Sequence, residues 1–224
     1  SLPLWCYIVF YALWTGGRSI FFAFVPIFLI EEFNMGMLQL SGLAVINTLI
    51  SAGVLMVLGK VSDRFGNRKL LIYISIFVAM SMFLWPLSAW FGLGTIILSY
   101  VINGLAGATH TMVLNNYGLE IFPAKGRAGY FALSRIIVGG NTILLINGAA
   151  AFLHYLENIH WKWTLLGVEL SRYHLLFIIG GLVAVSSFIP LVIAGNRKVP
   201  EEAVGDQERV DGADPLSSEF SHEA

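Results

Sequence analysis

Arg18 lies near the middle of an apolar stretch that begins at Leu4, directly after Gly16 and Gly17. A charge at the centre of a bilayer costs at least about 2.5–3.5 kcal/mol on insertion scales, so it must face protein, water or a ligand. The middle of the apolar stretches contains no Asp or Glu to neutralise it. A guanidinium group suits carboxylate or phosphate. We therefore predict that Arg18 attracts an anion in a cavity, and the structural alternative is an arginine that caps a broken helix.

Uncharged polar residues also interrupt the apolar stretches. Asn103 and His110 are seven positions apart, so they share one face of a helix. Such side chains suit either a cavity for a polar ligand or hydrogen bonds between helices, and a buried histidine suits either packing or proton relay. The predicted cavity residues are Arg18, Asn47, Asn103, His110, Asn115 and Asn141. The chain has no H-E-x-x-H motif, and we expect neither a metal nor a cofactor.

The composition excludes several classes of protein. Of the 224 residues, 57% are hydrophobic and 12% are charged, whereas soluble globular domains contain about 25% charged residues. The single cysteine, Cys6, excludes a disulfide framework. The formal net charge of −1 argues against nucleic acid as a partner. No charged segment precedes the first apolar stretch, so we expect no signal peptide.

Six apolar stretches are long enough to cross a bilayer as helices, which needs about 20 residues. They do not alternate polar and apolar residues as the strands of a membrane barrel would. The stretches are Leu4–Ile30, Met37–Leu58, Leu70–Trp90, Thr95–Ile121, Ala128–Leu153 and His174–Ala194. The sequence therefore predicts an all-α polytopic membrane protein with one six-helix bundle over residues 1–198. Residues 199–224 are acidic and lack an apolar face, which predicts a disordered tail.

Basic residues favour one orientation of the six helices. If the N-terminus is cytoplasmic, the cytoplasmic segments contain eight of them, and the outer loops contain only Lys162 and Arg172. Because cytoplasmic loops of membrane proteins are enriched in Lys and Arg, we expect the N-terminus and the tail on the cytoplasmic side of a plasma or inner membrane. The eight are Lys60, Arg64, Arg68, Lys69, Lys125, Arg127, Arg197 and Lys198.

The strongly polar residues are unevenly distributed among the stretches. They occur in the first, second, fourth and fifth stretches, whereas the third stretch and the sixth, after its first residue His174, contain nothing more polar than Ser, Thr or Tyr. Since polar groups in hydrocarbon are costly, we expect the first, second, fourth and fifth stretches to line an interior. We expect the third and sixth stretches to face lipid.

Two motifs at the predicted cytoplasmic side carry a family resemblance. The stretch GKVSDRFGNRKL, from Gly59 to Leu70, has the pattern G-x-x-x-D-R-x-G-x-R-K. It resembles the loop signature of the major facilitator superfamily, which lies between the second and third helices of a half and recurs between the eighth and ninth. The segment EIFPAKGR, from Glu120 to Arg127, resembles the cytoplasmic end of the family's fourth and tenth helices. Both motifs occur in the order that the family requires.

The resemblance implies one half of a twelve-helix transporter, built from two inverted repeats of three helices each. In the family, the N-terminal half usually carries an arginine in its fourth helix and a Gly-Pro motif in its fifth. The fourth stretch here has no arginine and the fifth has no Gly-Pro pair, so the resemblance favours the C-terminal half. The resemblance then implies alternating-access transport of a small anionic or polar solute across a lipid bilayer, with the N-terminal half as partner. It also implies no enzymatic activity.

The two motifs would form a latch at the cytoplasmic mouth, with Glu120 paired to Arg68. Asn67 departs from the family, which often has a basic residue at that position. Arg135 would join this charge cluster or lie just above it. The predicted gate residues are Gly59, Asp63, Arg64, Gly66, Arg68, Lys69, Glu120 and Arg127.

Two other hypotheses remain. A rhomboid-type intramembrane protease needs a nucleophilic serine in a G-x-S-G motif and a base, and the nearest match, Leu40-Ser41-Gly42, lacks the first glycine. Alternatively, the chain is an inactive or standalone half that needs a partner half. Solute flux in vesicles that contain only this chain distinguishes a standalone half from a fragment.

Overall fold

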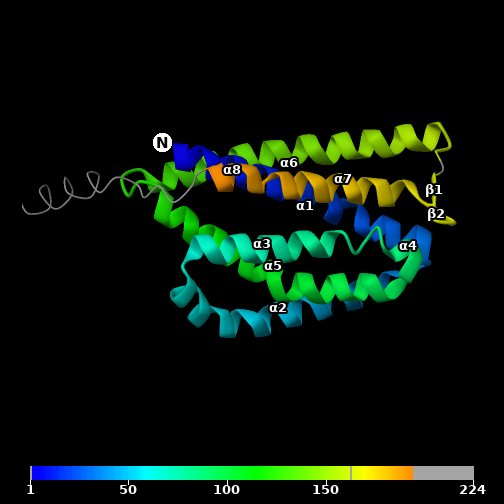
Figure 1. Ribbon diagram of the computed structural model, residues 1–224, viewed down its shortest axis with the longest axis horizontal. Helices are drawn as coiled ribbons and strands as arrows, with labels where there is room; N and C mark the ends of the chain where they lie inside the picture. Colours follow the sequence, from blue (N-terminus) through cyan, green and yellow to red (C-terminus); the bar gives the residue numbers. More distant parts are fainter. Residues whose placement is uncertain (1, 162, 194–224) are drawn as a thin grey trace, which may run out of the picture.

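A computed structural model describes residues 2–161 and 163–193, without the side chains of residues 57–65. In this part of the chain, helices lie nearly parallel along the long axis of the molecule, and a short β-hairpin lies at one end (Figure 1). The elements are α1 Leu2–Phe33, α2 Met37–Phe65, α3 Asn67–Met82, α4 Ser88–Phe91, α5 Leu93–Ile121, α6 Arg127–Asn158, β1 Trp163–Leu165, β2 Val168–Leu170, α7 Arg172–Ser186 and α8 Phe188–Ile193.

Five segments of the described chain are long and apolar enough to cross a membrane: Leu2–Phe33, Met37–Met56, Leu93–Ile121, Arg127–Asn158 and Arg172–Ile193. The all-α membrane fold is therefore confirmed, whereas the third predicted span differs. Helix α3 has only 16 residues and ends at Met82 instead of continuing to Trp90. Turns follow, with Trp85 donating to the Met82 carbonyl. Pro86 explains this end, because its ring would clash with the Met82 carbonyl in a continuous helix.

The last predicted span is interrupted in the same way. Helix α7 ends at Ser186, and α8 begins at Phe188. Pro190 lies four residues after Ser186, so an unbroken helix would bring its ring against the Ser186 carbonyl. By contrast, Pro26 lies inside continuous α1, where it cannot donate the backbone hydrogen bond that Phe22 would otherwise accept.

The helices pack in two groups. Helix α1 packs along α6 and α7, and α5 packs along α2 and α3. The first group lies toward the α6 edge of Figure 1 and the second toward the α2 edge. Each group combines helices from the first three and the last three predicted spans, so the predicted repeats interleave in space. A seam between α1 and α5 separates the groups, and Arg18 of α1 and His110 of α5 line a cavity beside it.

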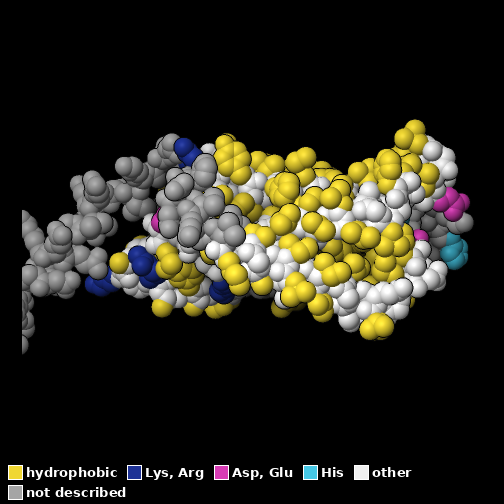
Figure 2. Space-filling view, turned by 90° about the horizontal axis from the view of Figure 1, so that it is seen from below, with side chains coloured by type: hydrophobic (Ala, Val, Ile, Leu, Met, Phe, Trp, Pro, Cys, Tyr) yellow, Lys and Arg dark blue, Asp and Glu magenta, His cyan; other side chains and the backbone are white. Residues whose placement is uncertain are grey.

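The two ends of the molecule differ in charge. On the face in Figure 2, Lys and Arg side chains gather at the end that holds the N-terminus, and the histidine and most carboxylates lie at the opposite end. The opposite end also holds α4 and the antiparallel hairpin of β1 and β2 (Figure 1). Leu166 and Gly167 form the tip of the hairpin with φ of 51° and 79°, which is typical of a tight turn.

Some predictions fall on residues that the structure does not describe. The predicted disordered tail, residues 199–224, lies outside the described residues, and of Gly59, Asp63 and Arg64 only the backbone is described. The other predicted gate residues are described. Gly66 joins α2 to α3 with φ of 77°, a conformation that glycine adopts without strain.

Candidate functional site

Two cavities lie along the seam between α1 and α5. The first, here named the basic cavity, has a volume of about 340 Å³ and contains two arginines from different helices. Its lining residues are Tyr11, Trp14, Thr15, Arg18, Ser19, Phe22, His110, Thr111, Leu114 and Arg135. No carboxylate is among these residues, so its described wall is positively charged.

Arg18 lies on α1 and reaches across to α5. Its Nη2 atom lies 2.9 Å from the point where a Cβ on Gly107 would stand, so the guanidinium rests against the bare α5 backbone. Its Cζ atom lies 5.0 Å from the centroid of the Phe22 ring, a cation–π contact. Within the described residues, Arg18 has no ion pair. The structure thus places this predicted residue at a cavity wall without a counter-charge.

Arg135 is the second positive charge of the basic cavity. It lies about two turns into α6, donates from Nη1 to the Tyr11 hydroxyl, and donates from Nη2 to Asn115 Oδ1 at 3.0 Å. The sequence predicts Arg135 in the cytoplasmic charge cluster or just above it and gives no signal for Tyr11. The position of Arg135 inside an apolar stretch was the available signal. Asn115, predicted to line the cavity, orients this arginine.

His110 lies in the same wall and is 1% exposed. Its ring stacks on Trp14 with 4.6 Å between ring centroids. In the described part of the chain, neither His110 Nε2 nor Trp14 Nε1 has a hydrogen-bond partner. Buried polar atoms are paired in the large majority of cases, so these two nitrogens are exceptions in a closely packed part of the wall.

The second cavity, here named the aromatic cavity, has a volume of about 230 Å³ and lies beside the first. Its lining residues are Phe21, Phe22, Val25, Ala44, Asn47, Thr48, Met82, Trp85, Tyr100 and Asn103. Phe22 lines both cavities. Two predicted cavity residues, Asn47 and Asn103, lie in this wall. The structure thus distributes the predicted polar residues over two compartments instead of one.

Asn141 makes a hydrogen bond between helices, which is the second of the two roles that its polar side chain predicts. Its Nδ2 atom donates to the Ala12 carbonyl at 2.8 Å, which joins α6 to α1, and it lines neither cavity. It also lies in a crowded place, because a Cβ on Gly16 would stand 2.6 Å from Asn141 Nδ2. Asn47 and Asn141 are both asparagines inside apolar stretches, so the sequence does not distinguish them. They differ only in the direction in which each side chain points from its helix.

The predicted gate differs in its central pair. Asn67 Nδ2 donates to Glu120 Oε1 at 2.6 Å, whereas we expected Arg68 in that place. Arg68 instead donates to the Leu191 carbonyl of α8 at 3.1 Å. Asn67 begins α3 and faces the last turn of α5. Arg68 points in another direction, because consecutive side chains of a helix do not share a face. Arg127 Nε donates to the Phe122 carbonyl at 3.4 Å within its own connecting segment.

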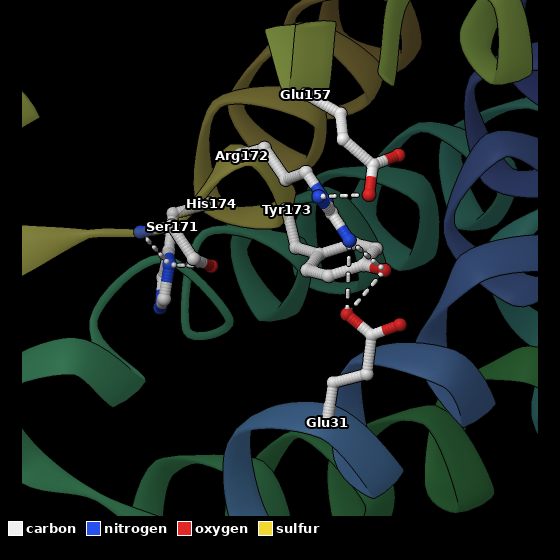
Figure 3. Close-up of polar contacts among 6 residues, drawn as sticks. All are labelled: Glu31, Glu157, Ser171, Arg172, Tyr173 and His174. Atoms are coloured by element: carbon white, nitrogen blue, oxygen red, sulfur yellow. Dashed lines mark hydrogen bonds and ion pairs between the residues drawn. The ribbon is translucent and has the colours of Figure 1, made fainter. Parts of the chain in front are cut away.

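A charged cluster joins three helices at the opposite end (Figure 3). Arg172, at the start of α7, lies 3.1 Å from Glu31 Oε2 and 3.2 Å from Glu157 Oε1. The Tyr173 hydroxyl also donates to Glu31 Oε2, at 2.9 Å. These contacts connect the end of α1, the end of α6 and the start of α7. No pattern in the sequence predicts this cluster.

The comparison with protein families decides the class of this arrangement. A family model described as the Major Facilitator Superfamily matches residues 1–139, more than half of the chain. The chain belongs to the major facilitator superfamily. No individual curated protein matches the sequence. The matched segment contains α1 to α5 and the start of α6.

Membership of the major facilitator superfamily and the five long apolar helices identify an integral membrane protein of a transporter family. Such proteins move small solutes across a lipid bilayer and are generally not enzymes. No observation favours the protease hypothesis, since Ser41 is exposed on α2 and no described contact joins it to a histidine.

Proposed function

We propose that this chain binds and translocates a small anionic or polar organic solute by alternating access, as a secondary transporter. The observation that carries the proposal is the basic cavity, in which Arg18 and Arg135 come together without a carboxylate in the lining. Two guanidinium groups inside a membrane are costly unless a counter-charge reaches them. A bound anionic solute supplies this negative charge during transport, and the charge is lost when the solute is released.

The positions of the two arginines support binding by both. Arg18 belongs to α1 and Arg135 belongs to α6, so a solute held between the two arginines contacts both helices. The guanidinium fork donates two parallel hydrogen bonds to one carboxylate. Arg135 is already oriented by Tyr11 and Asn115, which lowers the cost of ordering it when a solute binds.

We also propose that the chain is the C-terminal half of a twelve-helix transporter, with an N-terminal half as its partner. A partner half would have apolar surface to pack against, because the outer faces of α2 and α6 expose large apolar side chains in the described chain: Leu38, Leu49 and Met56 on α2, and Ile136 and Leu144 on α6. Another six-helix half or lipid would cover these faces. The basic residues at the N-terminal end in Figure 2 support a cytoplasmic N-terminus and tail.

Uptake by the intact protein in proteoliposomes tests the anion site. We expect Arg18→Ala to abolish solute uptake and Arg18→Gln to reduce it at least tenfold, because one bond to a charged group contributes about 1.5–3 kcal/mol. Arg172→Gln is the matched control and should keep near wild-type uptake. Arg172 lies at the start of α7, beside Glu31 near the end of α1, and does not line the cavity. Unchanged uptake in folded Arg18→Ala protein would contradict the proposal.

A further inference from the structure

The aromatic cavity offers hydrogen-bond acceptors of known orientation. Asn47 Nδ2 donates to the Tyr100 carbonyl at 3.0 Å, and Asn103 Nδ2 donates to the Ser99 carbonyl at 3.0 Å. A carbonyl only accepts, so a flipped amide would bring two oxygens together at either site. The amide oxygens therefore must point away from these bonds. Within the described residues, neither Oδ1 atom accepts a hydrogen bond.

A second contact fixes the amide of Asn103 further. The Ser81 hydroxyl donates to the Val78 carbonyl at 2.7 Å, so its oxygen is left to accept. Asn103 Nδ2 donates to it at 2.9 Å. Both hydrogens of the amide group are thus engaged, and its oxygen remains as the atom that can meet a ligand. The two amide oxygens therefore offer acceptors to a ligand that carries a hydrogen-bond donor.

Four of the other lining residues, Phe21, Phe22, Trp85 and Tyr100, are aromatic, and the core holds two of them in place. Trp85 and Phe21 are 5% and 3% exposed. Phe21 stacks on Phe177 with ring centroids 4.7 Å apart, and Trp85 contacts Tyr100 edge to face at 5.8 Å. Flat walls of this kind favour a planar ring, because aromatic pairs gain energy from offset stacking and edge-to-face contact beyond the buried area.

The two cavities are complementary in size and chemistry. Cavities for small molecules usually have volumes of about 300–1,000 Å³. The aromatic cavity alone, at about 230 Å³, is below this range, and the basic cavity, at about 340 Å³, is at its lower end. Phe22 lines both, and the Arg18 guanidinium lies over the ring of this shared residue. A ligand that extends past Phe22 meets positive charge in one compartment and aromatic rings with amide oxygens in the other.

We propose that the two cavities bind one aromatic organic anion that also carries a hydrogen-bond donor. Its carboxylate binds Arg18 and Arg135, its ring lies against Phe21 and Trp85, and its donor meets the amide oxygens of Asn47 and Asn103. This inference rests on the proposed transport function and narrows the class of solute.

The test measures dissociation constants on the intact protein in nanodiscs by calorimetric titration. Acetate, phenylacetate and 4-hydroxyphenylacetate form a series that adds first a ring and then a donor, and 2-(4-hydroxyphenyl)ethanol lacks the charge. We expect phenylacetate to bind at least about tenfold more tightly than acetate because a ring is buried. The added hydroxyl should improve affinity about threefold to tenfold, as one net hydrogen bond does.

Ala44→Phe fills the aromatic cavity from an exposed position on α2, so it does not disturb the core. We expect it to weaken 4-hydroxyphenylacetate at least about tenfold and to leave acetate unchanged. Ala52→Phe is the matched control, because Ala52 is exposed on the same helix and lines neither cavity. Arg18→Gln should weaken all three carboxylates and spare the alcohol.

The inference is overturned if the aromatic anions bind no more tightly than acetate, if none of them binds saturably, or if Ala44→Phe and Ala52→Phe behave alike. Acetate uptake into proteoliposomes, measured in parallel, separates this failure from failure of the proposed function. If uptake depends on Arg18 but aromatic anions are not preferred, only the inference of an aromatic anion is contradicted. Uptake that is indifferent to Arg18 removes the proposed function as well.

Discussion

Arg18 lies against the backbone of Gly107, with its Nη2 atom 2.9 Å from the position that a Cβ would occupy. We expect Gly107→Ala to push the guanidinium aside by a few tenths of an ångström. Since the displaced atoms are the end of a flexible side chain, the folding stability should change by less than about 1 kcal/mol. Anion affinity should fall severalfold, as measured by titration with acetate.

Gly94→Ala is the matched control for Gly107→Ala, because Gly94 lies on the same helix and has open space at its Cβ position. It should keep wild-type anion affinity. Wild-type affinity in Gly107→Ala would mean that the close contact with α5 does not position Arg18.

Gly17 provides the contrast, because its neighbours are backbone atoms. A Cβ at this position would stand 2.7 Å from the Gly180 carbonyl oxygen and 2.8 Å from the Ala184 nitrogen. Helices α1 and α7 would have to move apart, so we expect Gly17→Ala to destabilise the protein by about 1–3 kcal/mol. Thermal unfolding in detergent measures the loss. A midpoint equal to that of the wild type would contradict the close crossing of the two helices.

The Asn67–Glu120 hydrogen bond, 2.6 Å long, connects the start of α3 with the last turn of α5. Asn67→Asp places a carboxylate beside Glu120, and we expect repulsion to lower stability by up to about 1 kcal/mol, because the pair is exposed. Combining it with Glu120→Gln restores a donor and an acceptor. The double variant should therefore recover thermal stability, and if it is no more stable than Asn67→Asp, the pair is not a direct contact.

Arg172 bridges Glu31 and Glu157, whose side chains are 45% and 58% exposed. Exposed ion pairs contribute at most about 1 kcal/mol, and salt screens them. We expect Arg172→Gln to lower the unfolding midpoint slightly at low ionic strength, with a smaller difference at 1 M salt. Tyr173→Phe removes only the hydroxyl that donates to Glu31 and should show less salt dependence. A salt-independent effect of Arg172→Gln would show that packing, not charge, is responsible.

His110 was a candidate proton relay as well as a candidate packing residue. A relay needs a hydrogen-bonded group that receives the proton, and in the described chain His110 Nε2 has no such partner. We therefore expect His110→Gln to keep the wild-type pH dependence of transport in proteoliposomes, measured from pH 5 to 8. A shifted or flattened profile would instead support coupling through this histidine.

Sequence patterns predicted the class of fold because its causes are local. The lengths of the apolar stretches require membrane helices, and the loop signature around Gly66 belongs to the family that the comparison found. Boundaries were predicted less well. The third span ends early at Met82 because Pro86 interferes four residues later, and the same spacing separates Ser186 from Pro190. The positions of Pro86 and Pro190 were visible in the sequence, but the apolar stretches were drawn through them.

The candidate site shows where sequence stops being informative. By itself, the sequence determined that Arg18 must find a counter-charge or a polar surface, because burying a charge in hydrocarbon is costly wherever the helix lies. Asn47 and Asn141 both donate to a backbone carbonyl of another helix, and whether either also lines a cavity depends on how the helices rotate and interleave. Only the tertiary structure, by packing α1 against α6 and placing the seam with α5 beside it, brought Arg135 to Arg18 and left Asn141 to join two helices.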